Sequence, residues 1–167
     1  MNLSQQERLQ LINQFEILSI QNENDASHYQ ELIKILQSGY TIFYNQVFQH
    51  LSEEMSEESC KLVLNILDLY RAIEDTRART ASKELDDHRR STFLGFDGNS
   101  ETEYMCFARF LVVEQGKFRE QEQYLQKNDN MNSHMPMIEI YRRMLIAAGN
   151  YNIWEMSAED ALNILNA

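Results

Sequence analysis

Residues 60–73 read Cys-Lys-Leu-Val-Leu-Asn-Ile-Leu-Asp-Leu-Tyr-Arg-Ala-Ile, and this stretch decides the fold class. At 3.6 residues per turn, its leucine, valine and isoleucine side chains point in nearly every direction around a helix. A helix that is apolar on almost all sides is surrounded by protein. The stretch therefore predicts a central helix over residues 57–79, with Ser56 as its N-cap.

A second stretch, residues 101–115, has the same character, and Phe107, Phe110 and Leu111 are among its apolar side chains. Ser100 precedes it by one residue and is expected to form a capping box at its start. This pattern predicts a second central helix, buried beside the first.

Toward the N-terminus, capping signals and amphipathic spacing predict three more helices. Ser4 and Glu7 form a capping box before the first helix. Residues 27–37 carry an apolar stripe and form the second. The aromatic face of residues 40–51 indicates a third helix that packs deep in the fold.

Toward the C-terminus, Pro136 is expected to stand at the first position of one helix, and Ser157 is expected to cap a short last one. A polar connection occupies residues 117–135. We therefore expect an all-α fold: a compact single domain over residues 1–167, with about seven helices, two of them central and buried.

The composition supports helices and limits the partners. Five glycines and one proline are too few for the tight turns of an all-β fold. The formal net charge of −11 repels nucleic acid and anionic membrane surfaces. The sequence also shows no secretory signal and no apolar run of membrane-spanning length. We expect a cytoplasmic protein with no nucleic-acid partner and no membrane partner.

Signals for metals, cofactors and catalysis are missing from the sequence. Cys60 and Cys106 lie in apolar patterns, so we expect buried thiols rather than a disulfide or a nucleophile. The chain has no H-E-x-x-H, C-x-x-C, glycine-rich nucleotide loop or nucleophile elbow. Residues 97–108 fail as a calcium loop, because Thr102 and Ala108 stand where glycine and glutamate are needed. We predict no metal, no cofactor and no catalytic set.

The best candidate for a ligand site combines His88, Arg89 and Arg90 with the nearby Phe96 and Asp97. The imidazole and the carboxylate suit proton transfer, and the two arginines suit a bidentate grip on an anion. The preferred alternative is a solvated charged loop after a frayed helix end, in which the side chains pair with one another.

Arg109 is the second candidate, because it stands between Phe107 and Phe110 on the second central helix. A buried charge is paired, since an unpaired one is strongly destabilising. The preferred interpretation is an ion pair with a carboxylate at the edge of the core. The alternative is an arginine that binds an anion at the floor of a pocket.

Residues 87–97 read Asp-His-Arg-Arg-Ser-Thr-Phe-Leu-Gly-Phe-Asp, which is more distinctive than its physics requires. The other distinctive segments are Glu7-Arg8-Leu9, Gly39-Tyr40, Met135-Pro136, Tyr141-Arg142-Arg143-Met144-Leu145, and Ser157 before Ile164-Leu165-Asn166-Ala167. Together they resemble the YfbU-like family of bacterial proteins across nearly the whole chain, and residues 117–135 match least. The resemblance implies an all-helical fold, a bacterial cytoplasmic protein and self-association. It implies no known reaction, and it points only loosely to regulation of cell death.

We hypothesise a regulatory or scaffolding protein that forms a homo-oligomer and binds another cytoplasmic protein. The missing catalytic and cofactor motifs favour this over an enzyme, and the abundant aromatic and methionine side chains suit interfaces. The alternative is an enzyme or sensor for a small anionic ligand bound by Arg89, Arg90 and Arg109. A DNA-binding role for the C-terminal helix is disfavoured by the net charge.

Overall fold

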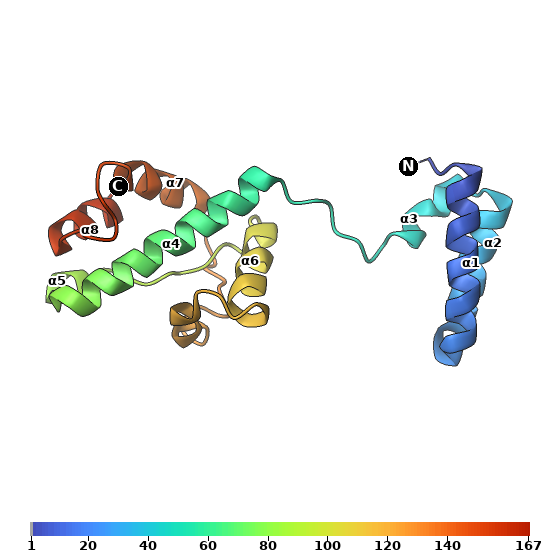
Figure 1. Ribbon diagram of the computed structural model, residues 1–167, viewed down its shortest axis with the longest axis horizontal. Helices are drawn as coiled ribbons and strands as arrows, with labels where there is room; N and C mark the ends of the chain where they lie inside the picture. Colours follow the sequence, from blue (N-terminus) through green and yellow to red (C-terminus); the bar gives the residue numbers. More distant parts are fainter. Residues whose placement is uncertain (1) are drawn as a thin grey trace. The chain divides into compact units, whose positions relative to one another are not determined.

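The computed structural model describes residues 2–167, and the regular elements in that range are all helical (Figure 1). The described residues also form one isolated backbone bridge, between Phe96 and Asn132. The all-α prediction is therefore confirmed. The chain gathers into two compact units, Met1–Glu54 and Met55–Ala167, and each has a hydrophobic core of its own. The single domain over residues 1–167 stays a prediction.

The N-terminal unit is built on two helices that pack side by side, α1 (Gln5–Gln21) and α2 (Ala26–Ser38). The predicted capping box at the start of α1 is confirmed. The Ser4 hydroxyl accepts the Glu7 N–H at 3.2 Å, and the Glu7 carboxylate accepts the Ser4 N–H at 2.8 Å. At the same end of the pair, α2 ends at Ser38 and is followed by Gly39, which has the left-handed φ of 69° that favours glycine.

Arg8 ties the two helices together. Its Nη1 donates to the Leu36 carbonyl at 3.1 Å, close to the C-terminus of α2, where the helix dipole favours a positive charge. Gly39 leaves room for this guanidinium, because a Cβ there would lie 2.9 Å from Nη1. Between the helices, the chain turns through the 3-10 segment η1 (Glu23–Asp25). Two of the distinctive segments, around Arg8 and Gly39, thus meet in one contact.

The core of this unit is small. Its buried side chains are Ile12, Leu32, Ile33, Ile35, Leu36 and Tyr44. The predicted helix over residues 40–51 is wrong in its extent: the chain forms the 3-10 turn η2 (Thr41–Phe43) and the single-turn α3 (Tyr44–Val47), and Leu51 is 73% exposed. The apolar pattern shows which side chains share a face, but it does not show whether another element covers that face.

The C-terminal unit is centred on α4 (Glu57–Thr80), as the sequence predicted. Ser56 is its N-cap, with a hydroxyl that accepts the Ser59 N–H at 3.0 Å. The buried side chains of α4 are Val63, Ile66, Leu67, Leu69, Tyr70, Ala72, Ile73 and Thr76. Within residues 2–167, no helix combines the length and the apolar character that crossing a bilayer requires.

Three helices pack against α4 (Figure 1). They are α6 (Thr102–Arg109), α7 (Ile138–Ala148) and α8 (Ala158–Leu165). The chain leaves α6 through a π-helical turn, η3 (Phe110–Glu114), so the second central helix is observed over residues 102–114, and Phe110 and Val113 are its exposed large apolar side chains. The polar connection contains the 3-10 segment η4 (Arg119–Tyr124).

The charged segment of residues 74–92 is more ordered than the frayed end and loop that we expected. It contains the last turns of α4 and the single-turn α5 (Lys83–Asp86). Arg77 pairs with Glu74 at 3.3 Å and with Asp86 at 2.9 Å. The first pair is spaced i, i+3, which stabilises a helix end.

Two predicted helix starts are wrong. Ser100 does not cap α6, because its N–H and its hydroxyl both donate to the carboxylate of Asp97, and the helix begins at Thr102. Pro136 lies before α7, which begins at Ile138. The capping box of Ser157 at the start of α8 is confirmed.

The prediction of buried thiols is wrong for Cys106. This side chain is exposed on α6, whereas Cys60 is half-buried on α4, and both cysteines are free. Helix spacing explains the exposure of Cys106. Met105 and Ala108, three residues apart, lie on the buried face of α6, and Cys106, next to Met105, points away from that face.

Candidate functional site

Residues 93–97, Phe-Leu-Gly-Phe-Asp, form a loop that pairs with the end of the polar connection. The Phe96 N–H donates to the Met131 carbonyl at 2.9 Å, and the Ser133 N–H donates to the Phe96 carbonyl at 3.0 Å. Gly95 has a φ of 89°, and a Cβ there would lie 2.0 Å from the Met131 carbonyl oxygen. Glycine alone fits this approach of two backbones. The most distinctive segment of the sequence is therefore a backbone junction.

Phe96, one of the predicted ligand residues, belongs to the core. Its ring centroid lies 5.6 Å from that of Phe93 and 5.6 Å from that of Tyr141, both edge to face. The Tyr141 hydroxyl donates to the Gly95 carbonyl at 2.9 Å. Burial raises the pKa of Tyr141 well above its ordinary value, so this hydroxyl stays a neutral donor. Phe96 thus supports the loop from inside.

Asp97 is engaged by the turn that follows it. Its Oδ2 accepts the Ser100 hydroxyl at 2.6 Å and the Ser100 N–H at 3.1 Å, and its Oδ1 accepts the Asn99 amide at 3.4 Å. The hydrogen bond from the Ser100 hydroxyl is the main cause that lowers the pKa of Asp97 below its ordinary value. The ionised carboxylate fixes the turn that leads into α6.

Glu101 is the buried carboxylate that joins this loop to α7. Its Oε2 accepts the Asp97 N–H at 3.0 Å, and its Oε1 accepts the N–H groups of Met137 and Ile138 at 2.8 and 2.9 Å. The first N–H groups of a helix have no partner within the helix, and the dipole favours a negative charge beside them. Glu101 is thus the cap of α7, supplied from a distant part of the chain.

His88 and Arg90 bind the C-terminal end of α8. The Arg90 Nη1 donates to the Leu165 carbonyl at 2.8 Å, and the His88 Nε2 lies 3.4 Å from the Asn166 Oδ1. The His88 Nδ1 accepts the Arg90 N–H at 3.2 Å. A cation beside the last carbonyls of a helix is favoured by the helix dipole. The main partners of this charged segment are therefore in the last helix and not in the segment itself.

Arg89 is exposed and lines a cavity of about 150 Å³ together with Arg90. The other lining residues are apolar: Leu94, Met135, Met137 and Ile140. Two guanidinium groups beside apolar walls suit a small amphipathic anion. Of the six predicted site residues, these two line this cavity and the other four do not.

Arg109 has a different partner from the one we expected. It is half-buried on α6, and its Nε donates to the backbone carbonyl of Asn130, so a carbonyl takes the place of the expected carboxylate. Arg109 and Phe96 therefore both contact residues 130–133, while His88 and Arg90 contact the end of α8. The structure places the candidates in two groups.

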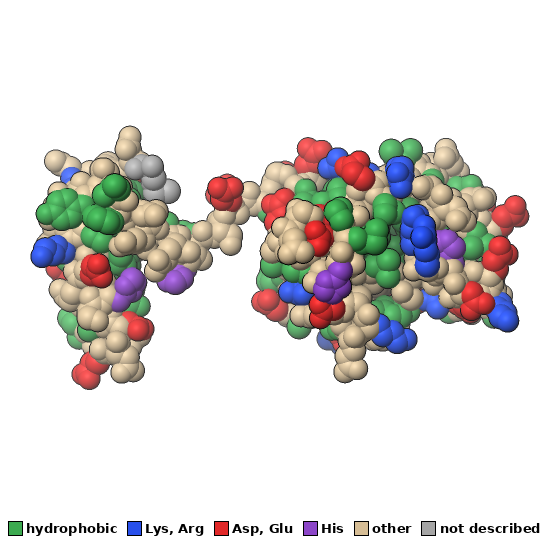
Figure 2. Space-filling model, turned by 180° about the vertical axis from the view of Figure 1, so that it is seen from behind, with side chains coloured by type: hydrophobic (Ala, Val, Ile, Leu, Met, Phe, Trp, Pro, Cys, Tyr) green, Lys and Arg blue, Asp and Glu red, His purple; other side chains and the backbone are tan. Residues whose placement is uncertain are grey.

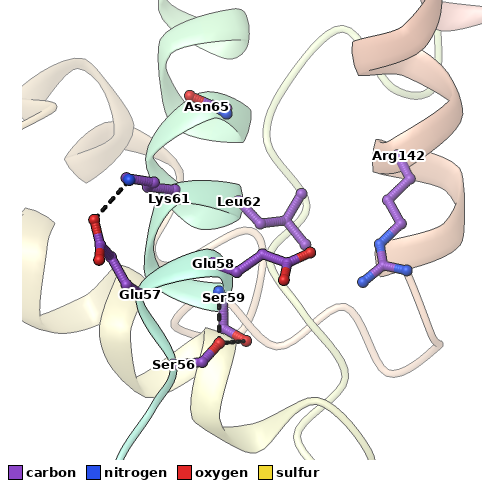
Figure 3. A pocket seen from close by; sticks show the side chains of 8 residues that line it. All are labelled: Ser56, Glu57, Glu58, Ser59, Lys61, Leu62, Asn65 and Arg142. Atoms are coloured by element: carbon purple, nitrogen blue, oxygen red, sulfur yellow. Dashed lines mark hydrogen bonds and ion pairs between the residues drawn. The ribbon is translucent and has the colours of Figure 1, made fainter.

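A larger polar cavity, of about 650 Å³, lies where the start of α4 faces α7 (Figure 3). Its lining residues are Ser56, Glu57, Glu58, Ser59, Lys61, Leu62, Asn65 and Arg142. Figure 3 shows Glu58 reaching from α4 into the space that Arg142 of α7 faces. Charges of both signs line this cavity. In the part of the chain that the structure describes, no three His, Cys, Asp or Glu side chains gather as a metal site would require.

Comparison with known sequences identifies the family. The family model of the YfbU domain matches residues 1–167. The chain belongs to the YfbU family. A UPF0304 protein of Methanocaldococcus jannaschii is 43% identical to it over 169 residues, which cover 99% of each chain. The resemblance read from the sequence is therefore confirmed. The bacterial origin stays a prediction, since this relative comes from Methanocaldococcus jannaschii.

The distinctive segments of this YfbU chain make structural contacts. Gly95 and Phe96 hold the loop against Met131, and Arg90 holds the end of α8. The sequence reasoning missed Glu101, because its partners begin a helix 36 residues further along the chain. It also missed the amide of Asn128, which donates to the Phe93 carbonyl at 3.1 Å and accepts the Met131 N–H at 2.9 Å. Neither residue has a local sequence signal.

Proposed function

We propose that this YfbU chain is a cytoplasmic regulatory or scaffolding protein that acts by binding proteins, and that it self-associates through one face of α1. The observation that carries the proposal is a second apolar stripe on this helix. A helix with apolar side chains on two faces is covered by protein on both of them.

The two stripes of α1 are distinct. The first contains Ile12 and Phe15, which pack into the core of the N-terminal unit against α2. The second contains Leu9, Ile17 and Ile20, spaced i, i+8 and i+11, which share another face of the helix. Their exposed fractions are 58%, 57% and 80%. The core of the N-terminal unit therefore does not cover the second stripe.

The N-terminal unit has too small a core to leave this stripe in water without cost. Small domains bury a low fraction of their surface and are marginally stable. Further large apolar side chains of the unit are exposed: Tyr40, Ile42 and Phe43. Figure 2 shows apolar side chains gathered on the surface of this unit. Covering the stripe of α1 with protein stabilises the unit through the hydrophobic effect.

A second copy of the chain fits this stripe because the stripe is almost uncharged. Residues 1–54 contain seven acidic and two basic side chains, so most faces of the unit repel their own copy. Beside the stripe stand the amides Gln6, Gln10 and Asn13, and its one charged neighbour is Glu16, seven residues after Leu9 and four before Ile20. A two-fold dimer pairs a surface with itself, and two helical pairs that meet in this way form a four-helix bundle.

Light scattering coupled to size-exclusion chromatography tests the proposal. We expect the wild-type chain to have the mass of two chains and the variant Ile17→Asp/Ile20→Asp to have the mass of one. Ile146→Asp is the matched control, because Ile146 is an isoleucine of α7 that is 76% exposed outside the stripe. A wild-type monomer at every concentration overturns the proposal, and so does an unchanged mass in the double variant that keeps its circular dichroism.

A second candidate function is the binding of a small anionic ligand, as in an enzyme or sensor. The observation that favours it is the cavity that Arg89 and Arg90 share with four apolar side chains. Calorimetric titration with hexanoate and with phosphate tests it. Arg89→Ala is the informative variant, since Arg90 also holds the end of α8, and the exposed Arg143 of α7 provides the control. Binding that is equal in both variants contradicts this candidate.

A further inference from the structure

A groove follows one side of α4 in the C-terminal unit. A cavity of about 450 Å³ lies between α4, α7 and the segment that joins α7 to α8. Its lining residues are Asn65, Asp68, Leu69, Leu145, Ala148, Gly149, Tyr151, Ile153 and Trp154. Asn65 also lines the polar cavity of Figure 3, so the two cavities adjoin along α4.

The groove has the length and the spacing that a helix requires. Glu58, Leu62, Asn65 and Leu69 recur along α4 at i, i+4, i+7 and i+11, which places them on one face. At 1.5 Å per residue this face is about 16 Å long, equal to about three turns of a partner helix. Grooves of this kind bind amphipathic helices through anchors at similar spacing.

Trp154 provides the largest apolar contact of the groove. It is 52% exposed, although tryptophan is the side chain with the most apolar surface to bury. Leu69, which lines the same cavity, is buried, and Leu145 and Ile153 are partly buried against the core. An exposed tryptophan in a partly apolar cavity is typical of the central contact of a protein interface.

Asp68 gives the groove its charge. Its closest cation is the Arg71 Nη1, at 3.8 Å. That arginine is held elsewhere, by Glu120 at 2.7 Å and by the Phe118 ring, whose centroid lies 4.3 Å away. The Asp68 side chain is 45% exposed, and the cavity around it has no lysine or arginine in its lining. The adjoining polar cavity has Lys61 and Arg142, which pair with Glu57 and Glu139. The Asp68 carboxylate therefore has room for a second cation that enters the groove.

We propose that this groove binds a basic amphipathic helix of a partner protein, with a lysine or arginine placed between Asp68 and Trp154. The carboxylate supplies an ion pair, and the indole supplies a cation–π contact and apolar area. The apolar face of the partner helix covers Leu69 and Leu145. The groove uses the C-terminal unit alone, so this inference goes beyond self-association through α1 and does not depend on it.

Fluorescence of Trp154, the only tryptophan of the chain, reports binding at this place directly. The probe is an acetylated 14-residue amphipathic helix of leucine and lysine, titrated into the full chain, with a leucine and glutamate helix of the same pattern as the negative control. We expect the lysine peptide to shift the Trp154 emission to shorter wavelength and the glutamate peptide to leave it unchanged. An unchanged emission with both peptides overturns the proposal.

The acidity of the whole chain also attracts basic peptides, so a matched pair of variants is needed. Asp68 and Asp75 both lie on α4 with an arginine at 3.8 Å, but only Asp68 lines the groove. We expect Asp68→Asn to weaken binding about fivefold, as the loss of one exposed ion pair does, and Asp75→Asn to leave it unchanged. Equal weakening by both variants indicates non-specific attraction and overturns the proposal.

Two further outcomes are distinguishable. If the groove binds a second copy of the chain, the Trp154 emission of the protein alone depends on its concentration, and the proposal of a basic partner is wrong. The peptide titration is repeated with Ile17→Asp/Ile20→Asp. We expect the same affinity as for the wild type, since the α1 stripe and the groove lie in different units. A lost affinity in that variant contradicts the proposed independence.

Discussion

The carboxylate of Glu101 accepts a hydrogen bond from the backbone N–H of Met137 at 2.8 Å, although 36 residues separate the two in the chain. The same carboxylate accepts the N–H groups of Ile138 and Asp97. The start of α7 and the loop before α6 therefore share one buried charge. Removing this charge is therefore expected to destabilise both elements together.

We predict that Glu101→Gln lowers the free energy of unfolding by about 3 kcal/mol, because the amide replaces one of the two carboxylate oxygens with an NH2 group, and the buried backbone N–H that faced that oxygen loses its acceptor together with the charge. Urea unfolding followed by circular dichroism measures the change. Glu103→Gln, at an exposed residue in the first turn of α6, is the control and is expected to change little. Equal effects of the two substitutions contradict the role of Glu101 as the cap of α7.

Gly95→Ala is expected to destabilise the chain by more than about 2 kcal/mol, because it combines a left-handed φ with a Cβ placed against the Met131 carbonyl. Gly98→Ala is the matched control in the same loop. A Cβ at Gly98 would lie 3.2 Å from the side chain of Asn132, a less severe approach than the 2.0 Å to the Met131 backbone at Gly95. Thermal unfolding compares the two, and a similar melting temperature for both contradicts the backbone junction.

The turn at Asp97 predicts a loss of stability in acid. The folded-state pKa of Asp97 is lowered, so its contribution is present above the ordinary value of 3.8 and is lost as the pH falls through the lower folded value. Glu7 and Asp160 have pKa values lowered by their cap serines and add to the same loss. We expect Ser100→Ala to reduce the difference in unfolding free energy between about pH 6 and about pH 3. An unchanged difference contradicts the assigned hydrogen bond.

The features of this fold that could be predicted from the sequence arise from interactions between residues close together in the chain. The caps at Ser4, Ser56 and Ser157 and the buried course of α4 follow from spacing within one or two turns. The wrong predictions are at residues where a second partner competes for the same side chain, and spacing does not show such a partner. Ser100 is of a residue type that often caps helices, but its hydroxyl donates to Asp97, three residues before it.

The candidate site could be predicted only in part for the same reason. The loop of residues 93–97 is distinctive in the sequence, but its partners Asn128 and Met131 lie in the polar connection, where the family resemblance is weakest. The polar side chains of His88 and Arg90 could be identified, but their contact with the last helix could not. These contacts join residues more than 30 positions apart, and periodicity carries no information at that distance.

Cysteine cross-linking across the proposed interface tests the central claim most directly. Asn13 lies between Leu9 and Ile17 on the α1 stripe, so a two-fold interface brings this position of the two chains together. In a background in which Cys60 and Cys106 are serine, we predict that Asn13→Cys forms a covalent dimer under mild oxidation. The exposed Glu139→Cys on α7 is the control and is expected to stay monomeric. A monomeric Asn13→Cys chain, or equal cross-linking at both positions, would contradict self-association through α1.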